Sequence, residues 1–473
     1  MRCRSIEADL NHQPVAGGRD LARFVTQFDP RSLDAADIER LTLLVMDHLG
    51  VALRGMRRQE ACMLRKWASR HAAPGATILL GGSGTADPSI AAFVNAAAAH
   101  TGEMDDTHDE SLSHPGAVVI ATALALAPAL NTTGLDFLAA IAMGYEVMAR
   151  TGMAVRAAAI ASNGFHPTGV LGGFGAAATA ARLFRLPYED LLAAWGLVLS
   201  AAGGSMQFSE EASASGVKQL HAARAAQEGI RAVDMVMHGI RGPIRAIEGR
   251  YGACQLFGGK PDFSRLDTTL STQLQIHQVT IKLYPSCRMC HSAIDALRQC
   301  TDNFTLDWKT IERIQIFGPA KLLAQHMQRR PQSMSAAQYS LPYTVAAALR
   351  FRGESIEPFE HWNLNDEETL TLLDKVAVVL DPCLDHAFPA HLGSKVALTL
   401  TNGTLREATV LDSRGTPWRP LTDAEVTSKF TALTSQAGIT QSHISQLETA
   451  VRATREAPNL GQLQMALASA NNQ

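Results

Sequence analysis

The sequence predicts a large, mainly α-helical domain joined to a smaller α+β domain. From Pro88 to about Gly258 the chain is rich in alanine and glycine and follows a helical pattern. Near Pro261 the character changes, and several later segments alternate apolar and polar residues as strands do. Beyond them, Thr422 and Glu425 fit a capping box, which predicts that the tail of the chain is helical again.

An amphipathic helix is expected over residues 34–53. Apolar side chains recur there on one stripe, after the acidic residues Asp34 and Asp37. A short strand is expected over 76–80. In the alanine-rich region that follows, small side chains allow helices to approach closely, which indicates a compact domain built of helices.

The second part is expected to be an α+β domain with at least one antiparallel pair of strands. Strands are expected at 279–284, 314–316, 376–380, 396–400 and 405–410. Asn402 and Gly403 separate the last two and predict a hairpin with a type I′ turn. Helical patterns intervene at 290–300 and 336–350.

Length and composition limit the classes of function. A chain of 473 residues should contain two or more domains, and 46% apolar with 18% charged residues is an ordinary globular balance. The formal charge of −3 gives no general basic field, so nucleic acid is not an expected partner.

No apolar run is long enough to span a membrane, and the start does not read as a secretory signal. The seven cysteines, an odd number, indicate a reducing compartment; a cytoplasmic protein is the simplest account, with an organelle matrix left open.

The stretch richest in reactive side chains is 101–120, where acids and histidines directly precede an apolar run. The acids are Glu103, Asp105, Asp106, Asp109 and Glu110, and they stand beside Thr107, His108 and His114. Pro115 disfavours helix at His114 and suits the first helical position itself, so a helix is expected to start there with His114 as its cap. Such a loop over a helix start suits general acid/base chemistry; the alternative is a solvated acidic loop.

His166 and Pro167 repeat this arrangement, so a second helix start with a histidine cap is expected there. A helix N-terminus carries a partial positive charge and free N–H groups, which makes it a site for anions. Lys218, followed three residues later by His221, adds a cation unless it is an ordinary surface lysine.

A third helix is expected to open in the same style at Tyr284-Pro285-Ser286, followed by Arg288 and His291. Three capped helix starts with imidazoles and cations suit a substrate that bears several carboxylates. A structural role for each histidine taken singly remains the alternative.

Two further patterns are typical of cofactor binding. The segment 287–291 matches the c-type haem pattern CxxCH, and a redox or zinc pair is also possible. The start shows no export signal, and no second cysteine pair stands at ligand spacing, so a strand-to-helix turn facing a cleft is expected instead. The segment 173–178 fits G-x-G-x-x-A, but no strand pattern precedes it, so close helix packing is expected there.

At these residues the chain resembles the MmgE/PrpD family, which includes 2-methylcitrate dehydratase, cis-aconitate decarboxylase and iminodisuccinate epimerase. The matching pieces, in family order, are Glu103-Met104-Asp105-Asp106-Thr107 with His114-Pro115, Gly164-Phe165-His166-Pro167, Val217-Lys218-Gln219-Leu220-His221, Lys282-Leu283-Tyr284-Pro285-Ser286-Cys287 with His291, and the helix 339–348.

The resemblance implies a helical domain formed by both ends of the chain, 1–265 and 411–473, with 266–410 as an α+β lid. The active site would lie between them, on a homodimer, with no metal or other cofactor. The resemblance places Asp106, Thr107, His114, His166 and Lys218 at the family's active-site positions. The residues expected to bind the substrate are Glu103, Thr107, His221, Tyr284, Arg288 and His291.

The chain departs from the family pattern at three places. Glu103 stands where many members carry aspartate, and Cys287 stands where some decarboxylases have histidine. No tyrosine precedes Arg330-Pro331, where some of those enzymes have one. These departures weaken the decarboxylase assignment in particular.

We therefore expect a metal-independent lyase acting on a small tricarboxylate, and the sequence favours dehydration of citrate or a 2-alkylcitrate. A cis-aconitate-type decarboxylase, an epimerase of a small dicarboxylate and a non-catalytic binding or scaffold protein remain alternatives. His114 and His166 are expected to share a cavity with Asp106, one transferring a proton at carbon and the other holding or protonating the leaving portion. Lys218 would stabilise the enolate-like charge.

Overall fold

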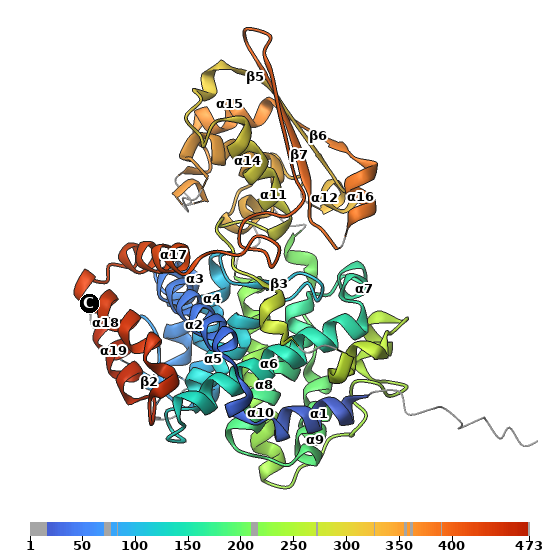
Figure 1. Cartoon of the computed structure of the whole chain (residues 1–473), viewed down its shortest axis with the longest axis vertical. Helices are drawn as coiled ribbons and strands as arrows, with labels where there is room; N and C mark the ends of the chain where they lie inside the picture. The colour runs from blue at the N-terminus through green and yellow to red at the C-terminus, as the bar shows by residue number, and fades with distance from the viewer. Residues whose placement is uncertain are drawn as a thin grey trace, which may run out of the picture.

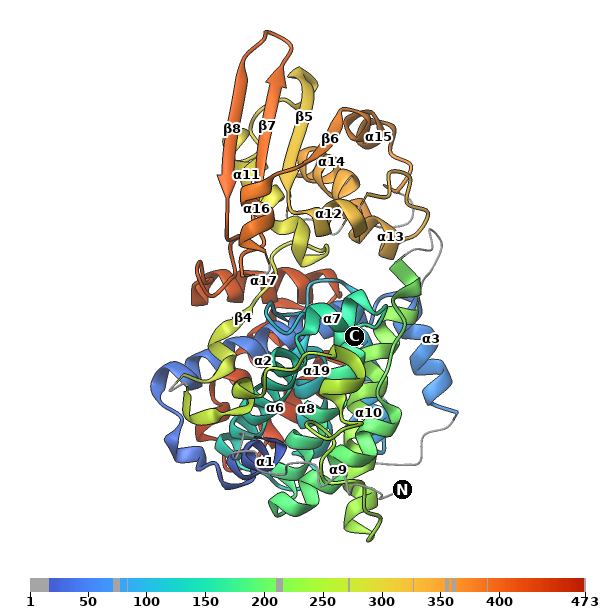
Figure 2. The same ribbon diagram turned by 90° about the vertical axis from the view of Figure 1, so that its right-hand side faces the viewer.

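A helical body carries a smaller α+β part at one end (Figure 1), and a quarter turn shows the sheet of that part standing above the body (Figure 2). The computed structural model describes residues 17–70, 77–82, 84–209, 216–270, 273–325, 327–353, 357–359, 363–388 and 390–471. The predicted fold class, a mainly helical domain with a smaller α+β domain, is confirmed.

The body begins with ten labelled helices. They are α1 (Gly18–Gln27), α2 (Ala35–Gly55), α3 (Gln59–Ala68), α4 (Pro88–Thr101), α5 (Pro115–Leu126), α6 (Gly134–Val155), α7 (Ala157–Ser162), α8 (Pro167–Leu183), α9 (Tyr188–Ala201) and α10 (Val217–Met237). The expected strand at 76–80 is reduced to β1 (Thr77–Ile78), which pairs with β2 (Thr85–Ala86); residue 76 lies outside the described residues.

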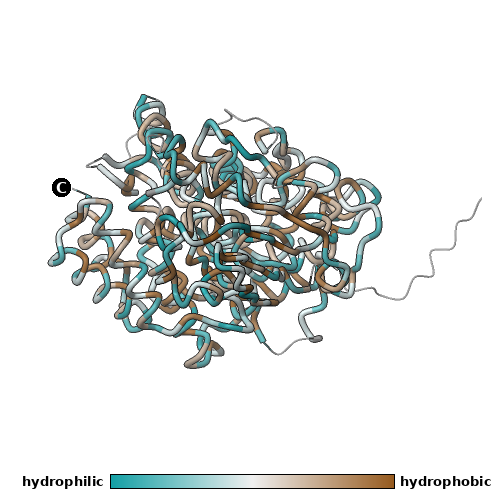
Figure 3. The backbone as a smooth tube through the Cα atoms, turned by 90° about the horizontal axis from the view of Figure 1, so that it is seen from above, coloured by the Kyte–Doolittle hydropathy of each residue, from teal (hydrophilic) through white to brown (hydrophobic). Residues whose placement is uncertain are grey.

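Helix α5 lies at the centre of the body, and every one of its residues is buried. It packs against α4, α6, α8 and α10, which explains why its sequence has no polar face. Small residues line the crossings as expected: a Cβ at Gly229 of α10 would collide with Ala176 of α8. In Figure 3, which looks down from above, hydrophobic and hydrophilic stretches alternate along the chain, and hydrophilic ones are frequent at the outer edge.

The chain returns to the body after the α+β part. Helix α17 (Asp423–Gln436) starts at the expected capping box of Thr422 and Glu425 and packs against α2. Its Lys429 ammonium contacts the Asp47 carboxylate of α2 at 2.6 Å and donates to the Met104 carbonyl at 2.9 Å. Helices α18 (Gln441–Arg452) and α19 (Gly461–Asn471) follow on the same side of the body (Figure 1).

The α+β part is built on a four-stranded sheet in the order β6-β5-β7-β8. The strands are β5 (Ile311–Gly318), β6 (Val376–Leu380), β7 (Ser394–Leu400) and β8 (Leu405–Val410). Strand β5 runs parallel to β6 and antiparallel to β7. Helices α11 (His291–Cys300) and α14 (Leu341–Phe351) pack against the sheet. Around them lie α12 (Ala320–Gln325), α13 (Met334–Gln338), α15 (Glu367–Asp374) and α16 (Pro382–Ala387).

Two local predictions in this part were wrong. The β7–β8 hairpin is present, but its turn is not type I′, because Gly403 takes a positive φ of 81° and Asn402 does not. The amide of Gly403 donates to the Leu400 carbonyl, so a tight turn is followed by a glycine in the left-handed region. The expected strand at 279–284 is only β4 (Val279–Thr280), paired with β3 (Thr107–His108), because the chain then leaves the body for the α+β part.

Among the described residues, no helix is long and apolar enough to cross a membrane.

Candidate active site

Four histidines from four helices gather where the body meets the α+β part. His100 lies in the last turn of α4, His114 and His166 cap α5 and α8, and His221 lies in the second turn of α10. The ring centroids of His114 and His166 are 6.1 Å apart, those of His100 and His114 4.8 Å, and those of His166 and His221 5.1 Å. Both expected histidine caps are confirmed. Neither side chain bonds its own helix start, because both rings turn towards the cluster.

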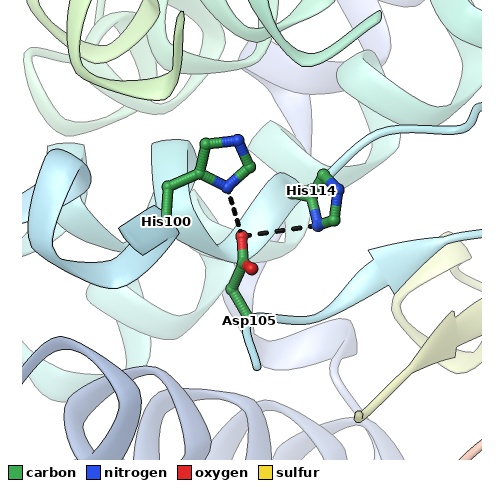
Figure 4. Close-up of side chains that lie close together, drawn as sticks. All are labelled: His100, Asp105 and His114. Carbon is green, nitrogen blue, oxygen red and sulfur yellow. Dashed lines mark hydrogen bonds and ion pairs between the residues drawn. The ribbon is translucent and has the colours of Figure 1, made fainter. Parts of the chain in front are cut away.

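Asp105 joins two of the four imidazoles (Figure 4). Its Oδ2 lies 2.6 Å from Nδ1 of His100 and 3.4 Å from Nδ1 of His114. Nδ1 of His114 is also 3.0 Å from the Asp106 carbonyl, which can only accept, so this nitrogen carries a hydrogen. A neutral His114 therefore has its lone pair on Nε2, the arrangement of a general base.

Burial lowers the pKa of all four imidazoles. The pKa values of His114 and His166 lie well below the ordinary value, and that of His221 falls to about 4; nearby cations and neighbouring rings add to the effect of burial. The pKa of Asp105 is also held well below its usual range, because His114 and His100 outweigh the cost of burying the carboxylate. Burial thus disfavours the charged form of each imidazole, while the Asp105 carboxylate favours the charged form of His100 and His114.

Lys218 is buried, not a surface lysine, with 3% of its side chain exposed. Its ammonium pairs with the Glu103 carboxylate. The same carboxylate pairs with Lys282, whose Nζ lies 3.2 Å from Glu103 Oε2. Burial disfavours the charge on Glu103, but the two lysines lower its pKa to about 2. Lys282 follows β4 in the segment that leads to the α+β part, so this ion pair joins the two parts of the chain.

Asp106 does not face the imidazoles as we expected. Its carboxylate accepts from the Tyr145 hydroxyl at 2.5 Å and from the Gly116 amide at 2.8 Å, at the start of α5. Burial raises its pKa to about 7 against these two donors. Adjacent residues point in different directions here, and Asp105 takes the place that we had assigned to Asp106.

The residues from Tyr284 to His291 also differ from the expected helix start. A 3-10 turn at Arg288–Cys290 precedes α11, which begins only at His291. The Tyr284 hydroxyl donates to Asp295, and His291 Nε2 bonds the Ser286 carbonyl at 3.2 Å. Both of these bonds stay within the α+β part.

Arg288 and Thr107 lie at the seam between the two parts. Arg288 pairs with Asp109 at 3.0 Å, and its Nε and Nη1 are buried without a partner among the described residues. Thr107 lies in β3, opposite Thr280, and its hydroxyl is likewise buried without a described partner.

Phe208 and Tyr339 form a wall beside the imidazoles. The Phe208 ring meets His166, His221 and Tyr339 edge-on, at centroid distances of 6.0, 5.8 and 5.8 Å. The Lys218 ammonium lies 5.8 Å from the Tyr339 ring centre. Tyr339 comes from the α+β part, so side chains from both parts enclose the cluster.

Five of these residues were not expected in the site: Asp105, which stands beside the expected Asp106, and His100, Lys282, Phe208 and Tyr339. His100 ends a run of alanines and belongs to no motif, and Phe208 stands alone in its loop. Lys282 opens a matching motif, and Tyr339 begins the last one, so their positions in those motifs were the available signal.

The two segments whose patterns are typical of cofactor binding form a turn and part of a closely packed helix. In segment 287–291 the Cys290 amide donates to the Cys287 carbonyl, which forms the turn before α11. The six cysteines in the described residues are free of disulfides. The glycines of segment 173–178 lie inside α8, where a Cβ at Gly175 would meet the Gly144 carbonyl of α6 at 2.9 Å. The expected helix packing is confirmed.

Within the described residues, His100, Asp105 and His114 also bring three potential metal ligands within 4.8 Å of one another. The 2.6 Å separation between His100 and Asp105 is that of a charge-assisted hydrogen bond. Nδ1 of His114 already donates to a carbonyl oxygen. We therefore describe the three side chains as a hydrogen-bonded group.

Comparisons with known proteins identify the family of the chain. The model of the MmgE/PrpD N-terminal domain matches residues 19–266, and that of the MmgE/PrpD C-terminal domain matches residues 284–453. The chain is 26% identical to a cis-aconitate decarboxylase-like protein of Aspergillus oryzae, over 94% of this chain and 95% of that one. It is 27% identical to the cis-aconitate decarboxylase of Homo sapiens, over 84% of each chain. The cis-aconitate decarboxylase of Aspergillus terreus is 23% identical, over 87% of each chain.

Proposed function

The chain belongs to the MmgE/PrpD family, and we propose that it is a carboxy-lyase that removes one carboxyl group from a small unsaturated tricarboxylate such as cis-aconitate. The sequence alone favoured dehydration of citrate or a 2-alkylcitrate. The names of the curated relatives support a lyase, and they favour decarboxylation over dehydration.

The observation that carries the proposal is the charge balance of the site. Lys218 and Lys282 are matched by the carboxylates of Glu103 and Asp105, while the four imidazoles are held neutral by burial. A tricarboxylate brings three negative charges into this enclosure. A negative charge within a few ångströms of an imidazole raises its pKa. Binding of the substrate should therefore cause the cluster of four histidines to take up protons.

Decarboxylation consumes such a proton, whereas dehydration recovers from carbon the proton that it gives to the leaving hydroxyl. Conversion of a tricarboxylate trianion to a dicarboxylate dianion and CO₂ consumes one proton, because a hydrogen replaces the lost carboxyl group. Dehydration consumes no proton overall, since the hydrogen and the hydroxyl both leave as water. A buried cluster that gains protons when an anion enters is therefore suited to decarboxylation.

The proposed step is an allylic decarboxylation. A protonated imidazole gives its proton to the alkene carbon, and the alkene π electrons form the new C–H bond. The bond to the departing carboxylate breaks, its electron pair forms the new double bond, and CO₂ leaves. We assign Lys218 to hold a carboxylate that stays, and His114 and His166, whose ring centroids are 6.1 Å apart, to flank the reacting carbons.

Dehydration of a citrate-like substrate is the second candidate. The bare Nε2 of His114 favours it, because dehydration needs a base to remove a proton from carbon. Cys287, which stands where some decarboxylases have histidine, favours it too. The homodimer and the cytoplasmic setting expected from the sequence belong to the proposal in either case.

Purified protein incubated with cis-aconitate, citrate and 2-methylcitrate tests the choice. Absorbance of the alkene and release of CO₂ are followed together in each reaction. The proposal expects CO₂ from cis-aconitate only. Alkene formation from citrate or 2-methylcitrate without CO₂ would replace it with dehydration.

A further inference from the structure

His100 belongs to no motif and has no role in the scheme above, yet it lies inside the imidazole cluster. Its side chain is buried, and its Nε2 has no hydrogen-bond partner among the described residues. The ring stacks on His166 at 5.6 Å with an angle of 25° and meets His114 edge-on at 4.8 Å. In Figure 4 its Nε2 lies on the ring edge away from Asp105.

The four imidazoles differ in where their helices place them. His100 is in the last turn of α4, where the partial negative charge of a helix C-terminus stabilises a cation. His114 and His166 cap the N-termini of α5 and α8, and His221 lies near the start of α10. A helix N-terminus has the opposite polarity and disfavours a positive imidazole. Only His100 of the four lies at a helix end that favours its charged form.

The contacts of the Asp105 carboxylate also favour a positive charge on His100 over one on the other three imidazoles. Asp105 contacts His100 at 2.6 Å and His114 at 3.4 Å, and His114 Nδ1 has the Asp106 carbonyl as a second acceptor. His166 and His221 share one hydrogen bond between their Nδ1 atoms at 3.0 Å, and no described carboxylate contacts either ring. His100 is therefore the imidazole whose positive charge is best compensated.

Other charged groups around His100 decide when it can be protonated. Burial lowers its pKa most, and the Lys218 ammonium of α10 lowers it further, while Asp105 and Glu103 oppose both. His114, His166 and His221 face it from α5, α8 and α10. From α2, Asp47 and His48 act on Asp105. A substrate carboxylate bound to Lys218 would offset the charge of its ammonium, which is the main cation that disfavours protonation of His100.

We propose that His100, oriented by Asp105, is the imidazole that takes up a proton when a tricarboxylate binds and delivers it from Nε2 to the substrate carbon. The assignment rests on the function proposed above. Nε2–H gives its proton to the alkene carbon as CO₂ leaves, and the ring returns to the neutral form. His114 and His166 stay neutral and hold the substrate.

Proton uptake on binding tests this role without turnover. Propane-1,2,3-tricarboxylate has no alkene and no hydroxyl, so it serves as an unreactive probe. Its binding is followed by calorimetry in buffers of different ionisation enthalpy near neutral pH, which gives the number of protons taken up. Wild-type protein should take up about one proton per site, and His100→Gln should take up close to none.

Asp105→Asn keeps the size of the side chain and removes its charge, so it should reduce the uptake even if His100→Gln does not fold. The control is His108→Gln, because His108 is buried and bonded to Ser111 and Gln275 outside the cluster. This control should keep the wild-type uptake. With cis-aconitate, His100→Gln should lose about 10²–10⁴-fold in kcat and should also lose the ionisation seen in the wild-type pH profile of kcat.

The outcomes separate the two proposals. A wild-type protein that binds no tricarboxylate overturns the proposed function itself. Binding with full proton uptake in both His100→Gln and Asp105→Asn overturns only the role of His100, and so does unchanged turnover of His100→Gln.

Discussion

Glu103 of the helical body and Lys282 of the segment entering the α+β part form a buried ion pair, with Oε2 and Nζ 3.2 Å apart. Lys282 also approaches the Glu103 carbonyl at 3.3 Å. Close by, the Gln338 side chain donates to the Gly102 carbonyl at 3.0 Å. The α+β part is thus fastened to the loop that carries the site, and the same glutamate positions Lys218.

This relationship predicts a loss of stability when Lys282 is replaced by methionine. The variant leaves the Glu103 carboxylate buried with Lys218 alone, and removing one partner of a buried pair should cost about 3 kcal/mol in the free energy of unfolding. Urea titration measures it. Lys309→Met is the control, because its pair with Glu368 is exposed and should matter little. Equal midpoints for the two variants would show that the buried pair contributes nothing.

Lys218→Ala should lower kcat/KM by about 10²-fold or more, since a charge-assisted hydrogen bond to a substrate carboxylate is removed. Because Lys218 is buried and paired with Glu103, we also expect its midpoint of unfolding to fall. Kinetics are therefore measured well below that midpoint. Wild-type kcat/KM in a folded variant would leave Lys218 with a structural role only.

His114→Gln and His166→Gln should each lower kcat by about 10²-fold or more, because glutamine keeps polarity and approximate size but cannot hold the substrate in the position from which it accepts the proton. Steady-state assays with cis-aconitate measure the loss. His386→Gln, an exposed histidine of α16, is the matched control and should keep full activity. Full turnover in both site variants would contradict the mechanism.

Asp106 predicts a pH dependence of stability. Burial raises its pKa to about 7, well above the ordinary value of an aspartate, so the folded state binds a proton that the unfolded state releases. Its stabilising contribution is present below the unfolded pKa and is lost as pH rises through about 7, by at most about 1.4 kcal/mol per pH unit. Urea titrations of wild type and Asp106→Asn between about pH 4 and about pH 8 test this. The advantage of wild type over the variant should shrink as pH rises; a constant difference would contradict it.

The local parts of the site were predictable from sequence. A proline fixes its own backbone and restricts the residue before it, so His114-Pro115 and His166-Pro167 identified two helix starts without any tertiary information. The capping box at Thr422 and the helix packing of segment 173–178 are similarly local.

The rest depends on contacts between residues far apart in the chain. Glu103 meets Lys218 and Lys282 from 115 and 179 residues away, which no spacing rule gives. The choice between Asp105 and Asp106 is decided by Tyr145 of α6, which holds Asp106 away from the cluster. His100 was missed because an alanine-rich helix gives no sign of what its last turn faces.

The central claim is that the site adds a proton to carbon while releasing CO₂. Reaction with cis-aconitate in unbuffered solution containing EDTA, at constant mildly acidic pH and with CO₂ swept out by nitrogen so that it does not form bicarbonate, measures acid consumption and CO₂ together. The account predicts one proton consumed for each tricarboxylate converted to a dicarboxylate and CO₂, with both signals greatly reduced in His114→Gln. Loss of the alkene with neither CO₂ release nor acid consumption, as in hydration to citrate, would contradict it.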